Sequence, residues 1–113
     1  MFLCVLKRRD VMKIIEWLSE QIEEEIADGK KYSEHALLWK QDYPKLADTL
    51  MKISEQEMQH MALLHNEVVD IIDDYRKKNG EPPSDMLAIY DYLHRKQIDK
   101  STEVKAMQIQ YRQ

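Results

Sequence analysis

The sequence has few of the residues that interrupt helices, with only two glycines and three prolines among 113 residues. Glycine and proline are the least favourable residues in a helix interior. Their scarcity therefore favours long, unbroken helices. Hydrophobic residues make up 43% of a chain whose length is typical of one domain. We predict an all-α fold with a single hydrophobic core.

Cysteine is almost absent as well, because Cys4 is the only one. A single cysteine excludes a disulfide within the chain and a metal centre built from four cysteines. It fits a reducing compartment, and the predicted location is cytoplasmic.

Long apolar runs and an excess of basic residues are also missing. No apolar run approaches the ~20 residues that span a bilayer. The net charge is −4, with 17 basic and 21 acidic residues, which leaves no basic surface for nucleic acid. The start of the chain places its apolar residues before Lys7, Arg8 and Arg9, the reverse of a secretory signal. We predict an N-terminal arm over residues 1–10, Met12 being an alternative start, and neither a nucleic-acid nor a membrane partner.

Three helices are predicted within a domain over residues 11–113, at about 11–40, 44–79 and 85–111. Asp10 is a suitable N-cap for the first helix, and Pro44 suits the first turn of the second. Asn79-Gly80 is a suitable stop for the second helix. The connection between the first two helices is short, which favours antiparallel neighbours. The apolar periodicity of the third helix is weaker. Its predicted inward side comprises Met86, Ile89, Tyr90 and Leu93 in the first half and, as one candidate series, Gln97, Lys100, Val104, Met107 and Tyr111 in the second.

The apolar face predicted for the second helix is interrupted by charge. Its members recur at helical spacing: Leu46, Leu50, Ile53, Met61, Leu64, Val68, Ile71 and Ile72. Glu57 falls within this series, and His60 follows on the same side of the helix. A carboxylate at such a position is costly unless it is paired or bound to a metal. Glu-x-x-His facing into a bundle is a ligand unit of two-metal carboxylate sites.

The first helix has a similar interruption at Glu25. Its predicted inward series is Ile15, Leu18, Ile22, Glu25, Gly29, Tyr32, Ala36 and Trp39. Glu25 lies 16 residues before Gln41, and Glu57 lies 13 residues after Pro44, so an antiparallel pair would bring them to nearly the same height. Gly29 suggests a close approach by a neighbouring helix. Two carboxylates and an imidazole suit iron or manganese, and zinc as a third choice.

With these residues the chain resembles the ferritin-like superfamily, and most closely its rubrerythrin branch. The family's first helix carries a Glu followed seven residues later by a Tyr, as Glu25 and Tyr32 do, and its second helix carries Glu-x-x-His, as Glu57 and His60 do. Glu103, eight residues before Tyr111, matches the third-helix pattern more weakly. The resemblance implies an antiparallel bundle with a di-iron or di-manganese site that reacts with oxygen or peroxide, or handles iron. It implies Glu25, Glu57, His60 and Glu103 as metal ligands.

The sequence departs from the family in lacking a second Glu-x-x-His and the rubredoxin-like domain, which needs four cysteines. Two copies of the helical hairpin would supply four Glu and two His. We therefore predict a homodimer or higher homo-oligomer that completes the site, for which encapsulated ferritins are a family precedent. The third helix would then lie outside the bundle or brace the dimer. Alternatively, a partner's third helix fills an open groove in a three-helix half-bundle.

The residues leave two other interpretations open. The chain could be a non-catalytic interaction module with a degenerate site, or an adaptor or structural hairpin unrelated to ferritins. Taken singly, Glu57 could lie on the surface, and the acidic run Glu23-Glu24-Glu25 could simply be solvated. The other histidines, His35, His65 and His94, are predicted to lie on the surface. Whether the protein is an oxidase, a peroxidase or no enzyme stays open, and no catalytic residue is assigned.

Overall fold

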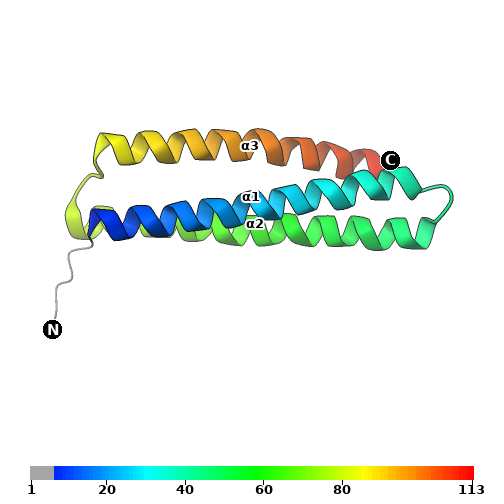
Figure 1. Ribbon diagram of the computed structural model, residues 1–113, viewed down its shortest axis with the longest axis horizontal. Coiled ribbons are helices and arrows are strands. Elements are labelled where there is room, and N and C mark those ends of the chain that lie inside the picture. The colour runs from blue at the N-terminus through cyan, green and yellow to red at the C-terminus, as the bar shows by residue number, and fades with distance from the viewer. Residues whose placement is uncertain (1–6) are drawn as a thin grey trace.

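The computed structural model describes residues 7–113, and within them the chain forms three helices and no strand (Figure 1). They are α1 (Arg8–Trp39), α2 (Pro44–Asn79) and α3 (Ser84–Arg112). The all-helical prediction is confirmed. Of the predicted N-terminal arm, residues 1–6 lie outside the described residues, whereas residues 8–10 already belong to α1.

The helix ends follow local chemistry, with one correction. Lys7, not Asp10, is the N-cap of α1, so the helix starts three residues earlier than predicted. Asp10 lies instead in the first turn, where its negative charge interacts favourably with the positive end of the helix dipole. The second helix spans the predicted range, with Pro44 in its first turn. It ends at Gly80, which has a φ of 83° and donates its N–H to the carbonyl of Arg76.

The core forms along α1, which packs against both other helices, whereas α2 and α3 barely touch each other. Val11 and Ile15 in the early part of α1 share a cluster with Ile72 and Tyr75 in the late part of α2. At the other end of α1, Ala36 packs with buried residues from the start of α2 and the end of α3. The result is an elongated bundle in which α1 and α2 lie side by side (Figure 1).

Gly29 marks the close approach that its position in the sequence suggested. The Ser54 hydroxyl donates a 2.7 Å hydrogen bond to the carbonyl of Gly29 across the α1–α2 interface. A Cβ at this position would lie 3.1 Å from the sulfur of Met58 and 3.4 Å from a methyl carbon of Val104. The absence of a side chain therefore lets α2 and α3 pack against α1 at one level.

The face that α2 buries differs from the predicted one in its first half. The buried positions there are Ala47, Met51 and Ser54, each one residue after a member of the predicted series. Leu46 is exposed, at 44%, and Leu50 and Ile53 are half-buried. The predicted series was wrong here because α1 covers the adjacent strip of α2. The predicted apolar residues form the edge of the interface instead of its centre.

The buried faces of α1 and α3 are also shifted in places. In α1, Ile26 and Ser33 are buried, whereas Tyr32 and Trp39 of the predicted series are only half-buried. In α3, the predicted Met86, Gln97, Val104 and Tyr111 are buried, but Ile89 is exposed.

Polar contacts along its length attach α3 to the α1–α2 pair. Lys96 lies 3.3 Å from a carboxylate oxygen of Glu23 on α1. At the far end of α3, the Tyr111 hydroxyl donates to Asp48, and Arg112 pairs with Glu55 at 2.6 Å. The last turn of α3 is thereby held against the start of α2.

Candidate metal centre

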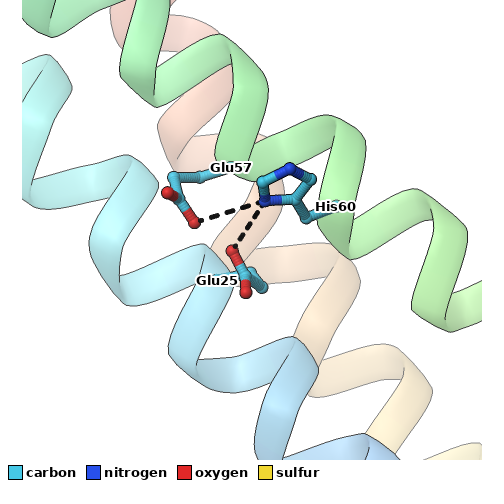
Figure 2. A group of neighbouring side chains, drawn as sticks. All are labelled: Glu25, Glu57 and His60. Atoms are coloured by element: carbon cyan, nitrogen blue, oxygen red, sulfur yellow. Dashed lines mark ion pairs between the residues drawn. The ribbon is translucent and has the colours of Figure 1, made fainter.

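Glu25 of α1 meets Glu57 and His60 of α2 in the middle of the bundle (Figure 2). One ligand atom from each residue can be chosen so that all three lie within 4.8 Å of one another. His60 Nδ1 lies 3.5 Å from Glu25 Oε2 and 3.9 Å from Glu57 Oε2. Three side chains of the types that bind iron, manganese or zinc therefore converge on one point.

The helices explain why these side chains meet. Glu57 and His60 are three residues apart, so they project from the same side of α2. Glu25 lies one turn before Gly29, where Ser54 ties the two backbones together. The close approach at Gly29 thus holds the carboxylates of two helices within reach of each other.

The electrostatic environment leaves the two carboxylates without a permanent positive partner. Among residues 7–113, neither Glu25 nor Glu57 pairs with a lysine or an arginine, and His60 is the basic group in contact. Their side chains are only 25% and 20% exposed, against 56% for His60. Within the same residues, Glu25 Oε2 is buried and no N–H group or hydroxyl donates to it. Such a pair requires a shared proton or a bound cation to offset the repulsion.

The pKa of Glu57 is raised to about 7 from an ordinary value of 4.5. The main cause is the hydrogen bond between the Glu57 and Glu25 carboxyl groups, followed by burial and the negative charge of Glu25. The nearby His60 acts in the opposite direction. A proton is therefore held where a metal cation would bind, and metal binding would release it.

The Glu25–Glu57–His60 group lies on the side of the hairpin that faces away from α3. On α1, Glu23 points towards α3, where it pairs with Lys96. Two residues along a helix turn through about 200°, so Glu25 projects from the opposite side. In Figure 2, α3 accordingly passes behind the hairpin while the three side chains lie in front of it.

Apolar side chains flank the group on this open face. On α1, Ile14 and Trp17 precede Glu25 by about three and two turns, and they are 47% and 57% exposed. On α2, Leu46, Ile53 and Leu64 are at the corresponding helical spacings from Glu57. We call this surface, comprising Ile14, Trp17, Glu25, Leu46, Ile53, Glu57, His60 and Leu64, the open face.

The structure brings together three of the four predicted ligands and leaves out the fourth. Glu103 lies on α3, is 62% exposed and pairs with Lys30 at 3.6 Å. It is separated from the group because α3 packs on the other side of α1. Tyr111, which matched the family pattern with Glu103, is buried and donates its hydroxyl hydrogen to Asp48.

One pair of residues was missed. His65 and His94, predicted to lie on the surface, are half-buried, and their rings stack with centroids 4.7 Å apart. The signal for His65 was its place four residues after Met61, at the margin of the apolar series. Nothing in the sequence indicates that His94 is its neighbour, because this depends on how α3 returns along α2.

Comparison with protein-family models, with curated proteins and with solved structures finds no match to this chain. In the part of the chain that the structure describes, none of the three helices is both long enough and apolar enough to cross a membrane. The case for a function therefore depends on the geometry of the site.

Proposed function

We propose that this protein is a ferritin-like metal-binding protein whose two-metal carboxylate site is completed by a second copy of the chain. The observation that carries the proposal is the convergence of the half-buried Glu25 and Glu57 with the exposed His60, where neither carboxylate pairs with a lysine or an arginine among residues 7–113. Glu25, Glu57 and His60 would hold the metal, together with the same residues of the second copy.

The number of ligands supports the involvement of a second copy. One chain offers two carboxylates and one imidazole at this point, whereas sites of this class use four Glu and two His. Two chains related by a two-fold axis would present two sets of three ligands to each other. Early α1 packs against late α2, as the proposed hairpin requires, and α3 lies on the far side, where it does not block the approach.

The apolar residues of the open face support the same assembly. Ile14, Trp17 and Leu46 are large side chains left in water by the single chain. Burying them against a second copy would be favourable by about 25 cal/mol for each Å² of apolar surface. Such an interface would also exclude water from the carboxylates, which strengthens their attraction for a cation.

Iron is the metal that we propose, with manganese and zinc as alternatives, because carboxylates and imidazole suit all three. A bound pair of iron ions would supply the electrons for a reaction with oxygen or peroxide. The contribution of the chain is to hold the ligands at the centre of two rigid helices and to release the proton of Glu57 when metal binds.

A second candidate is a helical interaction module without metal. The protonated Glu57 favours it, because one proton shared with Glu25 relieves the repulsion without any cation. Under this alternative the open face would still bind a partner, but its carboxylates would be dispensable.

Elemental analysis of protein purified without chelator, together with its mass in solution, tests the proposal. We expect about one iron per chain and a dimer or a multiple of it. In Glu57→Ala the iron should be lost, whereas the exposed Glu67→Ala on the same helix should retain it. A metal-free monomer would sink the proposal. The interaction module predicts instead that Glu57→Ala is at least as stable as the parent chain, since a repulsive half-buried carboxylate has been removed.

A further inference from the structure

A second cluster of metal-ligating side chains lies where α2 and α3 face each other. His65 of α2 and His94 of α3 stack with their ring planes inclined by 29°, and Tyr90 stacks on the outer side of His94 at 5.6 Å. The two rings line a groove of about 270 Å³, together with Met61, Asn66, Gln97 and Ser101. This groove is separate from the Glu25–Glu57–His60 group, which lies on the opposite side of the hairpin.

Among residues 7–113, the ring nitrogens of these two histidines have no hydrogen-bond partner. Among residues 7–113, their contacts are ring stacking with each other and with Tyr90, and no hydrogen bond reaches either imidazole. The nitrogens are also accessible to solvent. In that range the buried polar atoms without a partner belong to other residues and not to either ring. Each imidazole therefore retains a lone pair that is accessible from the groove.

The spacing of the rings suits a shared metal. A metal about 2.0–2.1 Å from an imidazole nitrogen lies about 3.2 Å from the ring centre, so two imidazoles at square or tetrahedral angles have centres about 4.5–5.2 Å apart. The observed separation is 4.7 Å. In the stacked arrangement the ring planes are inclined by only 29°, so both side chains must rotate before their nitrogens can point at one ion. Gln97 lies one turn after His94, is buried and lines the groove.

We propose that His65 and His94 form a second metal site, which binds a divalent transition metal with a preference for imidazole, Cu²⁺ or Zn²⁺. Two imidazoles provide the protein ligands, and water fills the remaining positions from the groove. The absence of a carboxylate makes the ligand set softer than that of Glu25, Glu57 and His60, which favours Cu²⁺ or Zn²⁺ over Mn²⁺. Neutral imidazole is the form that binds metal. Burial and the neighbouring His94 lower the pKa of His65, which favours this neutral form.

Such an ion would have a structural consequence. It would join α2 to α3, the pair of helices with the least direct contact. The metal-bound form should therefore be more stable than the metal-free form, and α3 should exchange its amide hydrogens more slowly.

The test uses the full chain carrying His60→Ala, so that the Glu25–Glu57–His60 group offers no imidazole. Absence of metal from that group then cannot be confused with absence of metal from His65 and His94. Copper electron paramagnetic resonance should show two imidazole nitrogens coupled to the ion. His65→Gln or His94→Gln should leave one coupled nitrogen and weaken Zn²⁺ binding in calorimetry by at least about tenfold, since even indirect supporting groups are worth that much at metal sites. His35→Gln, at a histidine on α1 that hydrogen-bonds the carbonyl of Lys31, is the matched control and should change neither result.

Circular dichroism and thermal unfolding in chelator establish that each variant folds. The spectrum of the His60→Ala chain is decisive in its own right, whatever the other variants do. A single coupled nitrogen in that chain, or equal Zn²⁺ affinity in the His65→Gln, His94→Gln and His35→Gln proteins, would overturn the proposal.

Discussion

The two sides of the α1–α2 hairpin carry opposite kinds of chemistry. On the side covered by α3, charged groups at the edge have partners of opposite sign, as Glu23 has in Lys96 and Lys30 has in Glu103. On the open face, Glu25 and Glu57 repel each other and share only His60. The side covered by α3 pairs its charges within the chain. Among residues 7–113, the open face has no covering helix, and its carboxylates and apolar groups have no third helix to pack against.

The largest effect that we expect is dissociation of the proposed dimer, and it tests whether the open face differs from the side covered by α3. Trp17→Glu places a charge among the apolar residues of the open face, and we expect the proposed dimer to dissociate because that charge would be buried without a partner. Analytical ultracentrifugation measures the mass. Tyr92→Glu, at an exposed aromatic residue on α3, is the control and should leave the mass unchanged. An unaltered mass for Trp17→Glu would mean that the open face is ordinary solvated surface.

The next effect concerns the point where the three helices meet. Gly29→Val adds carbon atoms where a Cβ alone already lies 3.1 Å from Met58 and 3.4 Å from Val104. We expect a loss of about 1–3 kcal/mol in the free energy of unfolding, the usual cost of overpacking. Urea denaturation measures it. Ala27→Val, at an exposed position of the same helix, should cost less than about 0.7 kcal/mol, which is the propensity difference alone. Equal losses in the two variants would argue against a close approach at Gly29.

A smaller effect is expected on the side covered by α3. Tyr111→Phe removes the hydroxyl that donates to Asp48, and we expect the chain to lose about 0.5–1.5 kcal/mol of stability, the typical contribution of a hydrogen bond, because Asp48 is exposed. Tyr92→Phe removes a hydroxyl from an exposed ring on the same helix and should be neutral. Burial and the bond to Asp48 raise the pKa of Tyr111 to about 12, so Asp48→Asn should lower the pKa measured by ultraviolet absorbance. No change in that titration would contradict the assigned bond.

The smallest effect is the dependence of stability on pH on the open face. The folded chain raises the pKa of Glu57 from 4.5 to about 7, so between these values the native state binds more protons than the unfolded state. The contribution of Glu57 to stability is thus fully present below pH 4.5 and is lost as the pH rises through about 7. Urea denaturation of metal-free protein across this range should show the decline in the parent chain. Glu57→Gln should flatten it, and an identical slope in both proteins would contradict the shared proton.

Much of the fold followed from the sequence. Few glycines and prolines, a periodic apolar series and the breaks at Pro44 and Gly80 predicted three helices close to the observed ranges. These signals are local, because helix propensity and capping depend on neighbours within a turn or two. The start of α1 was placed late because Asp10 resembles an N-cap, although the helix continues back to Arg8.

The candidate site was predictable to the extent that it depends on one hairpin. Glu57 and His60 share a helix face by their spacing alone, and the short connection before Pro44 fixes the height of Glu25. Glu103 was not predictable in this way. Its position depends on which side of α1 the third helix packs, and the weak apolar pattern of that helix did not indicate the side.

The sequence by itself determined the helices, their lengths and the height at which Glu25 faces Glu57 and His60. Only the tertiary structure decided which strip of α2 is buried, that α3 covers the side away from the carboxylates, and that His65 meets His94. The physical reason is the range of the interactions. Hydrogen bonds and capping within a helix act over a few residues, whereas the side on which a helix packs depends on the summed contacts of residues far apart in the chain.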